Sequence, residues 1–218
     1  ETTPIGAGAR ASVATAAGGM NAATRALFAV KLGQTDGEPV LVCDRLYIGS
    51  AGAAVRHATL RGHGITHILS LAEDACVPDR DAFTYFAQAL EDKPGAADRF
   101  LELLPACFEF IDKAIDRASP GKVLVHCLMG KSRSAAVVCA YLMRTRRVGR
   151  NAALGILRAR RAVAEPNMGF LLALKKYEKT LALEGTQGAE DGGKTPRTFG
   201  ETTQFCPGST IRPSQTNP

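Results

Sequence analysis

Two stretches of the chain place a cysteine six residues before an arginine: HCLMGKSRS at 126–134 and CPGSTIR at 206–212. A cysteine thiolate is a nucleophile, and an arginine guanidinium binds two phosphoryl oxygens at once, so both stretches hold groups suited to phosphate chemistry. The bare spacing also arises by chance in a chain with 6 cysteines and many arginines. The flanking residues must therefore decide between the two stretches.

No strand is predicted before the second stretch, and no helix is predicted after it. Pro207 follows Cys206 directly, and residues 185–218 are rich in Gly, Pro, Thr and Ser and poor in aliphatic residues. Such a composition cannot bury enough apolar surface to fold alone. We therefore predict a disordered tail over 185–218 and interpret the Cys206 match as accidental.

Cys127, in contrast, follows VLVH, a short apolar run typical of a buried strand, and a helical sequence begins near residue 134. In open α/β sheets, ligands bind beyond the carboxyl ends of the strands. A loop that enters a helix there can turn its N–H groups inward around an anion, and Gly130 permits the backbone angles that this needs. The predicted phosphate-binding residues are Leu128, Met129, Gly130, Lys131, Ser132 and Arg133.

The same loop would activate the thiol. The helix N-terminus, Lys131 and Arg133 all favour the thiolate form of Cys127, which is the nucleophilic form. Arg133 would position the phosphoryl group and stabilise the charge of the transition state. The alternative interpretations are a buried structural thiol at Cys127 and a solvated arginine at the start of a helix.

Strand-like and helix-like segments alternate through the chain, which favours a mostly parallel sheet flanked by helices. We predict a single α/β domain with a sheet of four to five strands over 39–184. Its leader, 1–38, is expected to be partly disordered or to hold one short helix. Strands are expected at 40–50, 65–71, 84–90 and 123–126, and helices at 51–64, 99–118, 134–146, 151–163 and 168–184.

The charge of the chain is uneven. The net charge is +6, but residues 131–161 hold nine Lys and Arg residues and no acid, so the remainder carries −3. We interpret this stretch either as a solvated helix surface or as a basic surface for an acidic docking segment. Nucleic acid is not expected as a partner, because no aromatic residue stands among the arginines of 144–161 to stack on bases.

The spacing of the cysteines and the composition of the leader indicate the cellular compartment that we expect. The six cysteines have neither C-x-x-C nor zinc-ligand spacing, so we expect reduced thiols and no metal site. No apolar run is long enough to span a membrane. The expected location is cytoplasmic, nuclear or both. An Ala-rich, acid-poor leader is also typical of a transit-peptide remnant, so an organelle is the alternative.

Five segments in order carry a family resemblance. H-C-x5-R-S after V-L-V is the signature of cysteine-dependent phosphatases, and HCLMGKSRSAAVVCAYLM closely resembles the dual-specificity branch. The segments LYIGSAGAA, GITHILSLA, FEFIDKAI and AVAEPNMGFLLALKKYE agree with it, so the resemblance covers about residues 40–182. The G-K-S-R-S loop is most similar to that of plant and algal members.

The resemblance implies a phosphotyrosine-phosphatase-like fold and hydrolysis through a phosphocysteine intermediate, without metal or cofactor. It also implies one carboxylate that acts first as acid and then as base. Asp92 is the preferred candidate, since the family often has Asp-x-Pro there, and Asp98 and Glu91 are its alternatives. Asp98 lies where a helix N-cap is expected. Ser134 matches the hydroxyl that hydrogen-bonds the cysteine sulfur, and His126 matches a residue that orders the loop.

The resemblance predicts a dual-specificity protein phosphatase for phosphotyrosine and phosphoserine/threonine, with a MAP kinase as candidate substrate and partner. A phosphoinositide phosphatase is one alternative, because Lys131 stands where lipid phosphatases of the superfamily also carry Lys. Leu128, however, stands where those enzymes carry a second basic residue. A catalytically dead phosphate-binding module is the other alternative, which the intact Cys127 and Arg133 disfavour. Asn167, in EPNMGF, matches a position at the start of the last helix, where a capping role is expected.

Overall fold

The computed structural model describes residues 36–72, 81–116, 118 and 121–187. The short helix predicted for the leader, the tail with Cys206, and Cys76 lie outside these residues. The elements are β1 (Val40–Cys43), β2 (Leu46–Gly49), α3 (Ala51–Ala54), α4 (His57–Gly62), β3 (His67–Ser70), β4 (Thr84–Ala87), the 3-10 turn η1 (Pro94–Ala96), α5 (Ala97–Ile115), β5 (Val123–His126), α6 (Arg133–Arg146), α7 (Arg150–Arg160) and α8 (Met168–Gln187).

The sheet has five strands in the order β1-β2-β5-β3-β4, and only β1 runs antiparallel to its neighbour. The predicted α/β class with a mostly parallel sheet is therefore confirmed. The single strand expected at 40–50 is wrong, because the chain reverses there. Asp44 adopts a left-handed conformation with φ 44°, and this turn divides the segment into the hairpin β1–β2.

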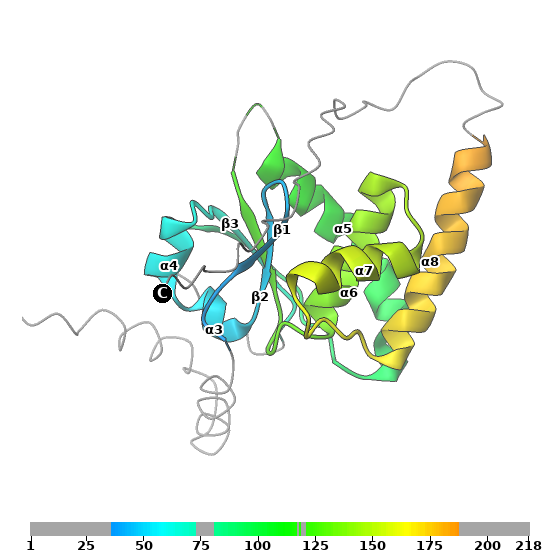
Figure 1. Cartoon of the computed structure of the whole chain (residues 1–218), viewed down its shortest axis with the longest axis horizontal. Coiled ribbons are helices and arrows are strands. Elements are labelled where there is room, and N and C mark those ends of the chain that lie inside the picture. The colour runs from blue at the N-terminus through cyan, green and yellow to red at the C-terminus, as the bar shows by residue number, and fades with distance from the viewer. Residues whose placement is uncertain (1–35, 73–80, 117, 119–120, 188–218) are drawn as a thin grey trace, which may run out of the picture.

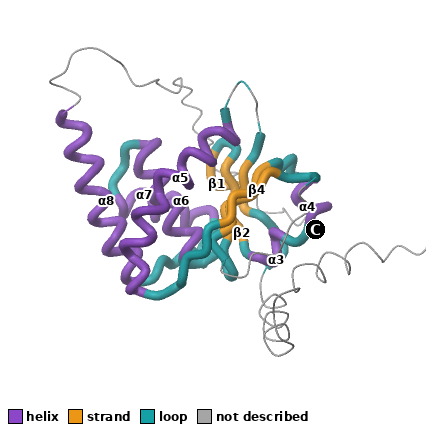
Figure 2. The backbone as a smooth tube through the Cα atoms, turned by 180° about the vertical axis from the view of Figure 1, so that it is seen from behind, coloured by secondary structure: helices purple, strands orange, loops and turns teal. Residues whose placement is uncertain are grey.

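The helices cover both faces of the sheet, with α5 to α8 on one side and α3 and α4 on the other (Figures 1 and 2). Successive side chains of a strand point to opposite faces of the sheet, so each strand can contribute to the core on either face. In β5, Val123 and Val125 pack into the larger core beneath α5–α8, whereas Leu124 packs into the smaller core with Leu60 of α4. The central strand is thereby buried on both faces, and its carboxyl end is held in place.

Two other expectations need correction. The helix expected at 51–64 is divided into α3 and α4, and Val55 closes the first of them by donating its N–H to Ala51 O. The expected N-cap role of Asp98 is wrong, since the residue before α5 is Ala96 and Asp98 lies inside its first turn. Among the described residues, the structure contains no helix whose length and apolar character would suit it to crossing a bilayer.

Candidate active site

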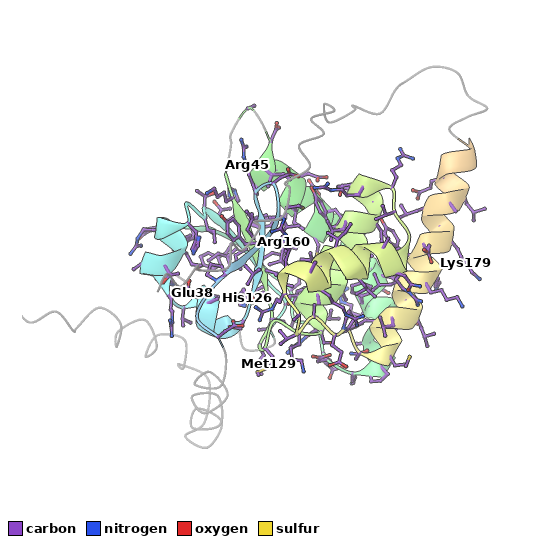
Figure 3. The ribbon with its side chains drawn as sticks, viewed as in Figure 1. Glu38, Arg45, His126, Met129, Arg160 and Lys179 are labelled. Carbon is purple, nitrogen blue, oxygen red and sulfur yellow. The ribbon has the colours of Figure 1, made fainter. Side chains whose placement is uncertain are left out.

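A loop of six residues joins the end of β5 at His126 to the start of α6 at Arg133. Cys127 is the first residue of the loop and is only 1% exposed. Met129, further along, is exposed and lies at the lower edge of the molecule as drawn in Figure 3, with His126 above it. The thiol therefore lies at the base of the loop, beneath its more exposed middle.

The backbone of the loop is turned so that its carbonyl groups face outward. All four carbonyls of residues 128–131 accept hydrogen bonds from other segments of the chain. The bonds run from Ala51 N to Leu128 O (3.0 Å), from Arg161 to Met129 O (3.2 Å) and Gly130 O (2.7 Å), and from Glu165 N to Lys131 O (2.7 Å). Because the N–H and C=O of a peptide point in opposite directions, this arrangement turns the loop's N–H groups inward, as an anion nest requires.

Gly130 is required by this path. Its φ is +66°, in the left-handed region that favours glycine. An added Cβ would lie 2.5 Å from Gly49 O and 2.6 Å from the Arg161 guanidinium. The predicted role of Gly130 in shaping the loop thus has a steric basis in the close approach of two neighbouring segments.

Arg161 is a functional residue that the sequence did not single out. Its side chain is almost fully buried, bonds two loop carbonyls and pairs with Asp36 at 2.9 Å. Asp36 is itself tied down, because Ser50 donates its hydroxyl to Asp36 O at 2.6 Å. Nothing in the local sequence distinguishes Arg161 from the other arginines of the basic stretch, since its partners are far away in sequence.

Arg133 is buried at the start of α6, and its guanidinium is braced from outside the loop. Nη1 donates to Leu71 O at 3.3 Å and to Leu90 O at 3.1 Å, and Nε lies 3.7 Å from Asp92 Oδ2. These contacts fix a cation at the helix N-terminus that closes the loop. The segment that carries the candidate acid also supports the arginine.

Among the three acid candidates, Asp92 is the one placed at the loop. Its Oδ1 accepts from Ser132 Oγ at 2.6 Å and from the Asn167 side-chain amide at 2.9 Å. Glu91 instead pairs with Lys93. Asp98 is largely exposed and pairs with Lys176 at 3.8 Å. Asp92 therefore lies at the loop, whereas Glu91 and Asp98 pair with residues outside it.

The residues flanking the nucleophile are also in place. Ser134 is fully buried, and its Oγ lies 3.3 Å from Cys127 Sγ. His126 Nδ1 lies 3.2 Å from Cys127 O. Burial lowers the pKa of His126 to about 4, so the ring is neutral near pH 7 and supports the loop as an uncharged group.

The basic stretch does not form one continuous set of unpaired charges. Lys131 lies 3.6 Å from Glu165, Arg144 pairs with Asp112, and Arg146 lies 3.6 Å from Asp44. Arg133 and Arg161 are turned inward to the loop. Within the described ranges, no three His, Cys, Asp or Glu side chains are grouped so that they could hold a metal ion.

Residues 46–180 match the family model described as dual specificity phosphatase, catalytic domain. The chain is 36% identical over 163 residues to Dual specificity protein phosphatase 1 of Arabidopsis thaliana, a match that covers 74% of this chain and 80% of that protein. The chain belongs to the dual-specificity phosphatase family. This confirms the family expected from the five ordered segments.

Solved structures agree with the assignment. A variant of human DUSP28 superposes with a TM-score of 0.63 at 34% identity, over 68% of this chain and 99% of that one. The human tyrosine phosphatase-like serine/threonine/tyrosine-interacting protein superposes with a TM-score of 0.61 at 31% identity, over 67% and 99%. The predicted phosphotyrosine-phosphatase-like fold is thereby confirmed. Because a protein named only phosphatase-like shares this fold, the fold alone does not establish the chemistry, which depends on the loop and its partners.

Proposed function

We propose that this dual-specificity phosphatase hydrolyses phosphotyrosine and phosphoserine/threonine in proteins through a phosphocysteine intermediate. The proposal rests on one observation: the loop carbonyls of 128–131 all bond outward, so the N–H groups turn in above Cys127. A phosphoryl group placed there would lie between these N–H groups and Arg133, with Asp92 beside the arginine. Preorganised donors of this kind stabilise charge on a transferring phosphoryl group.

The first step transfers the phosphoryl group to sulfur. Cys127 Sγ forms a bond to phosphorus while the bond to the ester oxygen breaks. Asp92, protonated at this stage, gives its proton to the departing oxygen and becomes a carboxylate. Arg133 holds the equatorial oxygens, since its guanidinium is already fixed by Leu71 O and Leu90 O.

The second step releases phosphate. Asp92, now a carboxylate, accepts a proton from a water molecule whose oxygen attacks phosphorus, and the bond between sulfur and phosphorus breaks. Cys127 leaves as a thiolate. The Ser134 hydroxyl, 3.3 Å from the sulfur, stabilises that charge by donating a hydrogen bond.

For the physiological substrate, we propose a doubly phosphorylated MAP kinase, as the loop resemblance suggests. The basic surface proposed for an acidic docking segment has less support, because Arg144 and Arg146 already have carboxylate partners within the domain. Recognition of such a kinase would then depend mainly on residues around the loop, such as the exposed Met129. Replacing Met129 with Ser should lower kcat/KM on the intact kinase more than on a short phosphotyrosine peptide.

The surroundings of Lys131 do not favour a phosphoinositide substrate. Its ammonium group faces Glu165 at 3.6 Å, which reduces the charge that Lys131 offers to a second phosphate. Leu128 supplies no charge at the other candidate position. Protein phosphoesters therefore fit the loop better than multiply phosphorylated headgroups.

The experiment is a phosphate-release panel run with EDTA and reductant. The panel holds phosphotyrosine and phosphothreonine peptides, a doubly phosphorylated MAP kinase and short-chain phosphoinositides, each assayed beside Cys127→Ser. Turnover of the phosphoproteins that the Cys127 change abolishes is the expected result. Turnover of lipid alone would overturn the proposed substrate class, and no turnover by the reduced protein would leave a phosphate-binding module.

A further inference from the structure

The segment that carries Asp92 is pressed against the start of α8. A Cβ on Gly169 would lie 2.2 Å from Pro94 O, so the two backbones touch at a point where only glycine fits. Asn167, two residues earlier, reaches across this contact and donates from Nδ2 to Asp92 Oδ1 at 2.9 Å. The position of the candidate acid is therefore coupled to the first turn of the last helix.

The orientation of the Asn167 amide is fixed by the helix itself. Phe170 N–H donates to Asn167 Oδ1 at 3.0 Å, which is the capping contact expected from the sequence. A backbone N–H can pair only with the oxygen of the amide, so the NH₂ group must face the other way. The cap thus determines that Asn167 presents a donor, and not an acceptor, to Asp92.

Ser132 completes the arrangement around the same carboxylate oxygen. Its hydroxyl oxygen accepts from Asn167 N–H at 3.1 Å, and its single proton goes to Asp92 Oδ1 at 2.6 Å. Oδ1 therefore accepts two hydrogen bonds, which occupy both of its lone pairs. The other oxygen, Oδ2, lies 3.7 Å from Arg133 Nε, the group proposed to hold the phosphoryl oxygens.

We propose that Asn167 is a positioning residue for the general acid: with Ser132 it occupies Asp92 Oδ1 and thereby assigns the transferable proton to Oδ2, beside Arg133. This inference rests on the proposed function, because the acid is the one that protonates the leaving oxygen. The proton leaves Oδ2 as the ester bond breaks, and it returns to Oδ2 from the attacking water. Asn167 has two roles, as a helix cap and as this donor.

The two roles can be separated by substitution. Asn167→Ser keeps an oxygen that can cap the Phe170 N–H, but its side chain is too short to reach Asp92. Asn167→Asp keeps both size and cap but turns an acceptor toward Asp92. Asn151→Ser is the matched control, since Asn151 lies exposed in the first turn of α7 and its side chain bonds only to Arg150 among the described contacts.

The measurement is kcat/KM on phenyl phosphate, a poor leaving group, and on p-nitrophenyl phosphate, a good one, near pH 7. A good leaving group departs without help, so loss of the acid affects mainly the poor one. We expect Asn167→Ser and Asn167→Asp to lose about tenfold on phenyl phosphate and less than about threefold on p-nitrophenyl phosphate. Asn151→Ser should leave both rates unchanged, and Asn167→Ser should add nothing in an Asp92→Asn background.

Equal losses on the two substrates, or an independent further loss in the Asp92→Asn background, would reduce Asn167 to a structural cap and overturn the proposal. A drop in the thermal midpoint without a leaving-group effect would do the same. If the wild-type protein turned over neither substrate, the proposed function would fail, and the positioning role would fail with it. An active wild type with no selective loss in the variants would overturn the positioning role alone.

Discussion

Two buried arginines serve the phosphate loop in different ways. Arg133 is 7% exposed and Arg161 4% exposed, and each guanidinium has two backbone carbonyls and a carboxylate around it. The carbonyls around Arg133 belong to Leu71 and Leu90, outside the loop, whereas those around Arg161 belong to the loop itself. Arg133 is therefore held so that it can bind a ligand, and Arg161 holds the loop in shape. Equal burial does not imply an equal role.

The largest effect is expected when Arg133, the arginine held to bind a ligand, is changed. Arg133→Lys keeps the charge but loses the planar fork that binds two phosphoryl oxygens, so kcat/KM on a phosphotyrosine peptide should fall by about 10³-fold. That loss corresponds to about 4 kcal/mol of transition-state stabilisation. The free energy of unfolding, measured with denaturant, should fall much less. A variant within tenfold of wild type would contradict the role assigned to Arg133.

The next effect concerns the neutral ring of His126, the last residue of β5. Burial, together with the nearby Arg133 charge, lowers the pKa of His126 to about 4, against an ordinary value of 6.5. The unfolded chain therefore binds a proton that the folded chain refuses between these two pH values, and stability is lost as the pH falls from about 6.5 toward 4. The loss amounts to about 3 kcal/mol.

Denaturant unfolding across this pH range gives the measurement. His126→Asn is the matched variant, because its amide nitrogen can take the place of Nδ1 next to Cys127 O. The variant should lose the acid sensitivity that the histidine contributes. An identical pH profile in the two proteins would show that His126 is not the group responsible.

Arg161→Lys tests the role of Arg161 in holding the loop in shape. The change leaves one of the carbonyls of Met129 and Gly130 without its donor, so the free energy of unfolding should fall by about 2 kcal/mol. Loss of kcat/KM should be about tenfold, far below that of Arg133→Lys. If the two lysine variants showed the same ratio of catalytic loss to stability loss, the distinction between the arginines would be wrong.

The smallest effect is expected at the outer partner of Arg161. Asp36 is 47% exposed on its side chain, so solvent screens its ion pair. Asp36→Asn should lower the free energy of unfolding by less than about 1 kcal/mol and leave kcat/KM within about twofold. A loss as large as that of Arg161→Lys would mean that residues ahead of the matched domain contribute directly to the loop's shape.

The same contrast explains what the sequence could and could not predict. Cys127 begins the loop, and Arg133 and Ser134 begin the helix that follows it, so the three residues lie close together in sequence and local pattern was enough to assign them. Arg161 binds the loop from the end of α7, and its partner Asp36 lies ahead of β1, far away in the sequence. Contacts of this kind depend on how the elements pack, and no local spacing reports them.

Asp92 and Asn167 show an intermediate case. The sequence identified each alone, one as a candidate acid and the other as a cap, and the structure brings them together at 2.9 Å. The contact depends on Gly169 meeting Pro94, which follows from the packing of α8 against η1. The fold shows the same limit. The alternation of strand-like and helix-like segments predicted a mostly parallel sheet, but it did not predict the hairpin, because no glycine or proline stands beside the left-handed turn at Asp44.

The most direct test of the phosphocysteine mechanism is to identify the atom that carries the phosphoryl group during turnover. Ser134→Ala should slow the second step and let the intermediate accumulate, so this protein would be mixed with a phosphotyrosine peptide, quenched under denaturing conditions and analysed by peptide mass. The phosphocysteine mechanism predicts one phosphoryl group on the peptide that contains Cys127, and none when Cys127→Ser is added. Steady turnover with no phosphoryl group on Cys127, or with one on another residue, would contradict it.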